Sequence, residues 1–171
     1  MIHYIFISMI FWSSIALLAG CTPTYDWRDV RGTSVPFTVL LPAKPSTFAR
    51  PVNLGGIQAR MTMTAAEIDK VTFAVGTAEL PDAAQAQAAL LVMKSTLVKN
   101  IGGVIRHEKS QLGRSDSSID FDAAGGTGET KALHAHLVAR ERRLYQIIVV
   151  GPEKSIRPEA VDTFLTSFKL E

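Results

Sequence analysis

The sequence predicts an α+β fold: an antiparallel sheet of about seven strands flanked by two helices, an α/β/α sandwich with the order βββ-α-ββββ-α. Seven segments have the length and composition of strands, and most of them alternate apolar with polar residues. Two other segments repeat their apolar residues at helical spacing. The connections between segments are short, which favours antiparallel neighbours.

Three predicted strands precede the first helix. The first is residues 37–41, whose odd-numbered side chains form one apolar face. The second, residues 55–68, alternates methionine and alanine with arginine and threonine, as a half-buried strand does. A tight turn at Asp69 and Lys70 leads into the third strand, residues 71–80.

The first helix is predicted over residues 82–101. Asp82 is a suitable N-cap residue, and the glycines at 102 and 103 end the helix. The apolar positions at helical spacing are Ala86, Leu90, Met93, Leu97 and Ile101.

Four further strands and a second helix complete the predicted domain. Tyr145–Val150 is apolar on both faces, which predicts a central strand that is covered on both sides. Pro158 opens the second helix. The four strands are residues 104–113, 117–124, 131–141 and 143–151, and the apolar stripe of the helix is Val161, Phe164, Leu165 and Phe168.

Composition narrows the function classes. The 171 residues suffice for one domain and a targeting segment. The net charge is +2, from 18 basic and 16 acidic residues that are spread along the chain, so the sequence does not predict nucleic-acid binding. A single cysteine excludes an intramolecular disulfide and a multi-cysteine zinc site, and we expect no cofactor.

The first 20 residues carry no Lys, Arg, Asp or Glu and contain an apolar segment of signal-peptide length. The segment ends in Leu18, Ala19, Gly20 and Cys21, and this pattern resembles the lipobox of bacterial lipoproteins. The resemblance implies cleavage between Gly20 and Cys21 by signal peptidase II and attachment of lipid, with acyl groups such as palmitate, to Cys21. An uncleaved transmembrane helix, or a Cys21 buried within the fold, remains the alternative.

The predicted organisation is a signal peptide at residues 1–20, a lipid anchor and tether at residues 21–35, and a single domain at residues 36–171. The membrane is thus one expected partner, through Cys21. Thr22 follows the cysteine, where resemblance to enterobacterial sorting rules links an aspartate with the inner membrane. We therefore expect an envelope location at the outer membrane, facing the periplasm.

A second resemblance covers about residues 35–170. The opening "FTVLLP", the strand "RLYQIIVVG" and the closing "FLTSFKL" look like the PsbP-like group, which includes an extrinsic photosystem II subunit, a yeast Ran-binding transport factor and many bacterial lipoproteins. Phe164, Ser167 and Phe168 match the closing pattern. The resemblance implies an α/β/α sandwich and roles in binding and assembly, and it assigns no functional residue.

His134 and His136 form the sharpest candidate site. At positions i and i+2 of a strand, both imidazoles project from one face, a spacing that zinc and copper sites use. A metal site needs a third ligand, for which His107, Glu108 and Asp120 are candidates. Two histidines without a fixed third ligand are a weak indication, so we favour a polar strand face over a metal site.

Three other motifs have simpler structural interpretations. The segment GGTGETK, residues 125–131, lacks the lysine and hydroxyl residue of a phosphate loop after its last glycine, and predicts a hairpin. The serines of GRSDSS, residues 113–118, lack a nucleophile elbow and are typical of turns. Asp120 and Asp122 share a strand face and are expected on its solvated side.

Two groups are candidate surface contacts. Arg140, Arg142 and Arg143 gather at a predicted hairpin tip, where they either meet anionic headgroups or form a solvated turn. Tyr25 and Trp27 lie at the membrane interface or, as we favour, pack on the domain.

Two functions of different classes follow from the sequence. The first is a lipid-anchored envelope protein that acts as a binding or assembly accessory for a protein or another envelope component, without catalysis. The second is a small metal-dependent or hydrolytic enzyme that uses His134 and His136. We favour the first.

Overall fold

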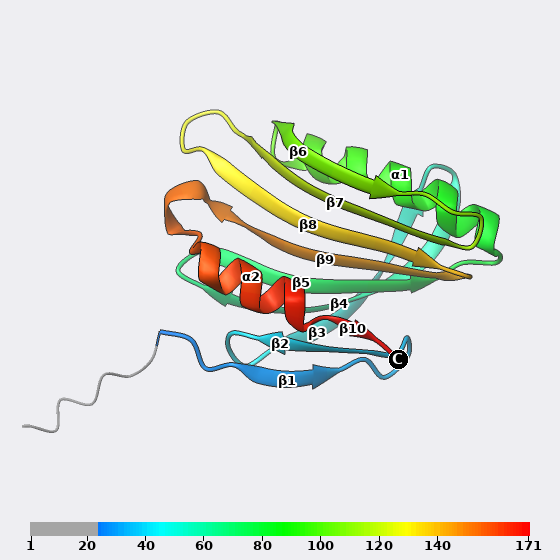
Figure 1. The fold of residues 1–171 in the computed structure, drawn as a ribbon, viewed down its shortest axis with the longest axis horizontal. Coiled ribbons are helices and arrows are strands. Elements are labelled where there is room, and N and C mark those ends of the chain that lie inside the picture. The colour runs from blue at the N-terminus through cyan, green and yellow to red at the C-terminus, as the bar shows by residue number, and fades with distance from the viewer. Residues whose placement is uncertain (1–23) are drawn as a thin grey trace, which may run out of the picture.

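A seven-stranded antiparallel sheet with the strand order β3-β4-β5-β9-β8-β7-β6 is the centre of the computed structural model, which describes residues 24–171 (Figure 1). A smaller sheet has the order β1-β2-β10. The elements are β1 (Arg28–Arg31), β2 (Phe37–Leu41), β3 (Ser46–Leu54), β4 (Ile57–Ile68), β5 (Val71–Glu79), α1 (Ala83–Asn100), β6 (Gly103–Gln111), β7 (Asp116–Gly125), β8 (Lys131–Arg140), β9 (Arg143–Pro152), the 3-10 helix η1 (Glu153–Ser155), α2 (Pro158–Ser167) and β10 (Lys169–Leu170).

The predicted fold class is confirmed. Three strands of the large sheet, β3 to β5, precede α1 in the chain, and its other four strands, β6 to β9, lie between α1 and α2. One strand assignment was wrong. Residues 37–41 form β2, but β2 pairs with β1 and β10 rather than with the large sheet. The first strand of the large sheet is β3, which the sequence pattern did not predict.

The position of β3 explains why it was missed. It is an edge strand whose side chains are almost all exposed, so it lacks the apolar alternation that marks a half-buried strand. It also contains Pro51, which cannot donate a ladder hydrogen bond and is tolerated in an edge strand. Only its pairing with β4 identifies the segment as a strand.

The described part of the predicted tether, residues 24–35, belongs to the domain. Residues 28–31 form β1, which pairs with β2, and the backbone N–H of Asp26 donates to the carbonyl of Pro42 at 2.9 Å. The ring of Tyr25 stacks on Trp27 at 5.6 Å, and Trp27 meets Phe73 edge-on at 6.5 Å. Tyr25 and Trp27 thus pack on the domain, as we favoured, and the ordered fold starts well before residue 36.

The helix α1 packs on one face of the large sheet. Asp82 caps it as predicted, since its carboxylate accepts from the N–H of Gln85 at 2.8 Å, and Gly102 after its end has a φ of 59°. Ala86, Leu90 and Met93 are buried against the sheet. The core on this face extends to both sides of the sheet centre, from Met61 and Met63 to Ile119, Phe121, Leu133 and Leu137.

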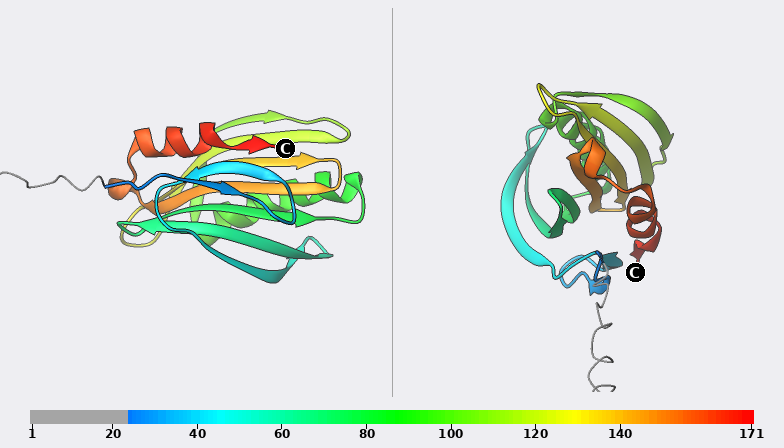
Figure 2. Two further views of the ribbon diagram at one scale, coloured as in Figure 1. Left: turned by 90° about the horizontal axis from the view of Figure 1, so that it is seen from below. Right: turned by 90° about the vertical axis from the view of Figure 1, so that its left-hand side faces the viewer.

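The opposite face is only partly covered. The helix α2 packs mainly on β2 and β9, where Phe73, Val149 and Phe164 belong to a second core (Figure 2). The predicted central strand is confirmed, because β9 lies fourth of seven and Leu144–Val149 are buried on both faces. The strands β6, β7 and β8 extend beyond α2, and within residues 24–171 no helix lies over that part of this face (Figure 1).

Among residues 24–171, no helix combines the length and the hydropathy needed to cross a bilayer.

Candidate functional site

The uncovered strands carry a regular array of histidine and aspartate. Antiparallel pairing places Asp122 opposite His134 and Asp120 opposite His136. In each pair the imidazole Nδ1 lies 2.6 Å from a carboxylate oxygen. An ionised carboxylate only accepts hydrogen bonds, so the Nδ1 of each pair carries the donated proton. His107 of β6 extends the row, since its Nδ1 lies 3.9 Å from the second oxygen of Asp122.

We call this array, made of His107, Asp120, Asp122, His134 and His136, the His-Asp surface. Its members are graded in exposure, from 82% for the side chain of His107 to 29% for His134 and 27% for His136. The ring of His136 is held edge-on by Phe168 at 6.1 Å. His136 is therefore held by both Asp120 and Phe168, whereas His134 is oriented by Asp122 and His107 is largely exposed.

The structure does not supply the third metal ligand that the sequence required. Asp120 is engaged with His136, and Glu108 points to the α1 side, where it accepts from Lys94 at 2.9 Å and from Ser110 at 2.8 Å. Over residues 24–171 no group of three or more His, Cys, Asp or Glu side chains is arranged to hold a metal ion. What the arrangement offers is two oriented imidazoles beside a groove.

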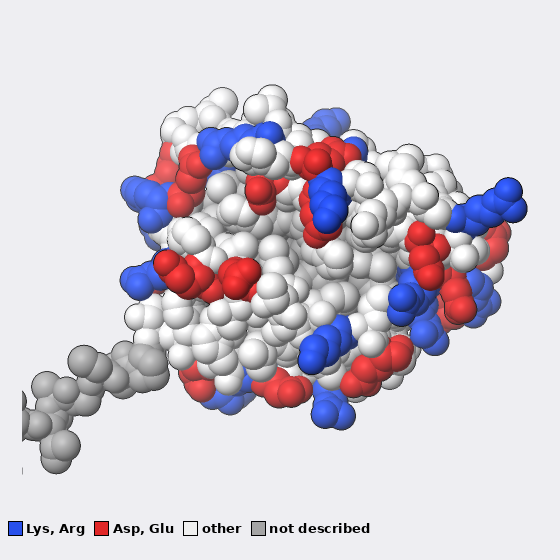
Figure 3. Space-filling model, viewed as in Figure 1, with Lys and Arg blue, Asp and Glu red and all other residues white. Residues whose placement is uncertain are grey.

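That groove lies between α2 and the strands, and we call it the α2 hollow. Its volume is about 550 Å³, and most of its lining is apolar. The apolar lining comes from Ala123, Ala132, Ile156, Pro158, Val161 and Leu165; the polar lining comes from Arg106, Asp122, His134, Glu153, Asp162 and Thr166. Figure 3, which views this side of the molecule, shows uncharged surface across the middle of the face and charged side chains around it.

An ion pair closes one end of the α2 hollow. A β-bulge between Ile105 and His107 leaves Arg106 without a partner residue on β7. Such bulges redirect a side chain, and here Arg106 reaches Glu153 of η1, across the two strands that separate β6 from β9. The guanidinium of Arg106 holds the pKa of Glu153 below its ordinary value, and Glu153 in turn raises the pKa of Arg106.

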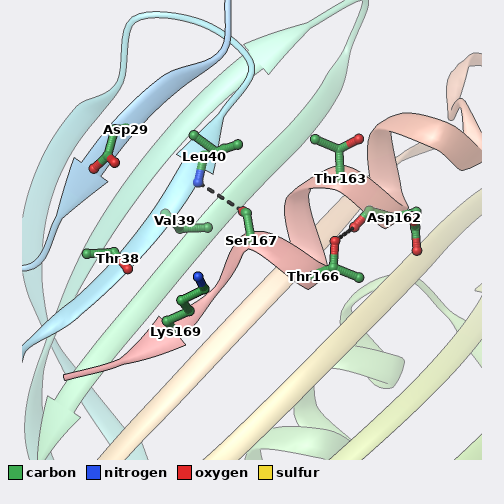
Figure 4. Close-up of a pocket in the computed structure, with 9 residues that line it drawn as sticks. All are labelled: Asp29, Thr38, Val39, Leu40, Asp162, Thr163, Thr166, Ser167 and Lys169. Atoms are coloured by element: carbon green, nitrogen blue, oxygen red, sulfur yellow. Dashed lines mark hydrogen bonds between the residues drawn. The ribbon is translucent and has the colours of Figure 1, made fainter.

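A second hollow, of about 470 Å³, lies on the other side of α2 and has a more polar lining (Figure 4). Ser167 joins its two walls, because its hydroxyl accepts from the N–H of Leu40 at 2.9 Å and donates to the carbonyl of Phe164 at 2.7 Å. Thr166 donates to the backbone carbonyl of Asp162 at 2.6 Å. The hydroxyl groups of Ser167 and Thr166 thus already have hydrogen-bond partners within the fold.

The arginine cluster is divided among intramolecular partners. Arg142 pairs with Glu79, and Arg140 lies 3.6 Å from Asp116. Arg143 lies beside the hydroxyl of Tyr145, whose pKa is raised by burial. Two of the three guanidinium groups thus have acidic partners, which favours the solvated-turn interpretation of the hairpin over a basic membrane patch.

The two remaining sequence motifs lie at the two ends of β7, and Ser117 and Ser118 belong to that strand. Residues 126–130 connect β7 to β8, and Glu129 in this connection pairs with Lys154 at 2.7 Å. Ser117 is buried, and its hydroxyl accepts from the N–H of Gly113 at 2.9 Å. Gly20 and Cys21 lie outside the described residues, so the predicted cleavage and lipid attachment remain predictions.

Sequence reasoning found the histidines but missed most of the site around them. Arg106 and Glu153 are ordinary charged residues in the sequence, and only the bulge and the end of β9 bring them together. Val161 and Leu165 were assigned to an apolar stripe, and the structure shows that the same stripe also lines the α2 hollow.

No family model matches this chain, and a search of curated proteins likewise found no match.

Proposed function

We propose that this chain is a lipid-anchored protein of the cell envelope and acts as a non-catalytic binding or assembly accessory, with the His-Asp surface and the α2 hollow as its binding region. The main support is the placement of an oriented polar array beside a mostly apolar groove, next to the part of the sheet that extends past α2. Binding sites commonly combine apolar walls with a few fixed polar groups.

The anchor is proposed at Cys21, with the domain at the outer membrane and facing the periplasm. The lipobox-like residues Leu18–Cys21 support this location. Several acyl chains would hold the protein stably, since each buried methylene contributes about 0.8 kcal/mol. The resemblance to the PsbP-like group supports a binding rather than a catalytic role.

One observation favours a second candidate, a metal-dependent or hydrolytic enzyme. A carboxylate at Nδ1 orients a histidine in many catalytic and metal sites, and both His134 and His136 have such a partner. Metal analysis of the purified protein tests this candidate. Stoichiometric metal that is lost in the His134→Ala/His136→Ala variant would establish it, and no bound metal at neutral pH would remove its metal-dependent form.

Site-specific photocrosslinking in cells tests the proposed binding region. A photoreactive amino acid at position 107, on the His-Asp surface, should give a discrete crosslinked product. The same amino acid at position 91, an exposed position of α1 on the opposite side, is the matched control and should give none. A product from position 91 and none from position 107 would overturn the assignment of the binding region.

Intact mass tests the anchor independently of the binding region. The native protein should begin at Cys21 and carry acyl groups, and Cys21→Ser should remove them. Recovery of a chain that still carries Met1 in the membrane fraction would contradict the proposal.

A further inference from the structure

We propose that the α2 hollow binds a single-chain amphiphile with an ammonium-bearing head, such as a lysophosphatidylethanolamine, taken from the membrane that holds the chain. This inference rests on the proposed lipid anchor at Cys21. The proposed function names a binding region without a ligand, and this inference names the class of ligand.

The size and walls of the α2 hollow suit an alkyl chain. Its volume of about 550 Å³ lies within the range of small-molecule sites, roughly 300–1,000 Å³. Val161 and Leu165 of α2, together with Ile156 just before that helix, form an apolar side of the hollow. Water gains few hydrogen bonds on such walls, so an alkyl chain that replaces it is favoured by the hydrophobic effect.

The charges at the rim select the head. Three carboxylates, Asp122, Glu153 and Asp162, face the hollow, and Arg106 is the one permanently charged base among its lining residues. Even a protonated His134 would leave an excess of one negative charge (three acidic groups against two basic ones). A head that carries a cationic ammonium is therefore favoured over a purely anionic head. Where the same head carries a phosphate, Arg106 can pair with that phosphate.

The short connection to the anchor brings the hollow near the lipid. Tyr25 lies four positions after Cys21, and a fully extended chain of that length spans at most about 14 Å. The backbone is then fixed, because Asp26 donates to Pro42. In two perpendicular views, the blue segment that precedes β1 begins at the same end of the domain as α2 (Figures 1 and 2). The end of the hollow at Glu153, Ile156 and Pro158 is therefore at the anchored end of the domain.

Photolabelling of the anchored full-length protein tests the inference. The protein is reconstituted in phosphatidylcholine vesicles that contain a small fraction of diazirine-bearing lysophosphatidylethanolamine or lysophosphatidylglycerol. The two probes share the acyl chain and the phosphate and differ in the ammonium group. The ethanolamine probe should label peptides that contain Ile156 and Leu165, and it should do so severalfold more than the glycerol probe.

Two variants keep the test decisive. Leu165→Asp places a carboxylate against the alkyl chain and should lower labelling about tenfold or more, whereas the matched control Leu91→Asp on α1 should leave it unchanged. Glu153→Gln/Asp162→Asn keeps the apolar walls and should bring labelling by the two probes close to equality. Thermal unfolding of each variant checks that it is folded. If Leu165→Asp does not fold, the Glu153→Gln/Asp162→Asn variant alone tests the inference.

Two results would overturn the inference. Equal labelling by the two probes would remove the ammonium selectivity, and labelling that Leu165→Asp does not change would remove the site. Vesicle flotation separates these outcomes from failure of the proposed anchor: a protein that floats with the vesicles and is not labelled at the hollow contradicts the ligand alone, and a protein that does not float contradicts the anchor.

Discussion

The two faces of the large sheet differ in how far they are covered and in the polarity of their side chains. On one face α1 lies over the sheet, and an apolar core extends from Met61 to Leu137 beneath it. On the other face α2 covers only the part around β9, and the neighbouring strands present histidine and aspartate to solvent. Both faces belong to the same strands, so alternate residues of β7 and β8 serve two different environments.

This difference separates stability from binding. The buried side of β7 carries Ile119 and Phe121, which are almost fully buried, and its open side carries Asp120 and Asp122. Substitutions on the α1 face should therefore act on folding, whereas substitutions on the His-Asp surface should act on binding. The predictions that follow test this separation, from the largest expected effect to the smallest.

The largest losses of stability are expected at the two cores. Phe164→Ala should lower the free energy of unfolding by about 3–5 kcal/mol, and Leu90→Ala by about 2–5 kcal/mol, because both side chains are fully buried. Urea unfolding measures both values. A loss below about 1 kcal/mol at either site would show that the corresponding core contributes less than its burial indicates.

Removal of the cap of α1 should have an intermediate effect. Asp82→Ala deletes the carboxylate that accepts from Gln85 and should destabilise the protein by about 1 kcal/mol. The measurement is again urea unfolding, with Asp82→Asn as the variant that retains a capping oxygen. Equal loss in both variants would exclude the cap as the cause.

The pairs of the His-Asp surface should contribute little to stability. A double-mutant cycle on Asp122 and His134 should give a coupling of about 0.2–1 kcal/mol, because the pair is partly exposed and the neighbouring backbone remains paired. The same variants should lower photocrosslinking from position 107. A coupling of several kcal/mol without a change in crosslinking would show that the His-Asp surface stabilises the fold and does not bind a partner.

The smallest effect is a pH dependence at Glu108 on the α1 side. Hydrogen bonds from Lys94, then from Ser110, hold the pKa of Glu108 below its ordinary value of 4.5. A carboxyl with a lowered folded-state pKa contributes stability above its unfolded pKa and loses it as the pH falls through the folded value. The difference in stability between wild type and Glu108→Gln should therefore shrink below about pH 4.5. A difference that stays constant from pH 6 to pH 3 would contradict the assigned cause.

The sequence predicted those elements that have a local signal in the spacing or type of their residues. Both helices, the central strand β9 and the cap at Asp82 carry local signals, and each is present in the structure. The edge strand β3 and the short strand β1 were missed because exposed edges have no apolar alternation, and pairing with a distant partner defines them.

The candidate site was predictable only in part, for a related reason. Spacing along β8 identified His134 and His136, but their partners depend on the register with β7, which places Asp122 and Asp120 opposite them. The ion pair of Arg106 with Glu153 joins residues 47 positions apart through a bulge that leaves no mark in composition. Long-range register and local irregularity are tertiary properties, and a single sequence does not state them.

Hydrogen exchange of the full-length protein tests the central claim most directly. Amide protection is compared between the protein in its native membrane and the same protein in vesicles of phosphatidylcholine alone. The account predicts added protection in β6, β7, β8 and α2 of the native sample, with α1 unchanged. Added protection on α1, with none at the His-Asp surface, would contradict it.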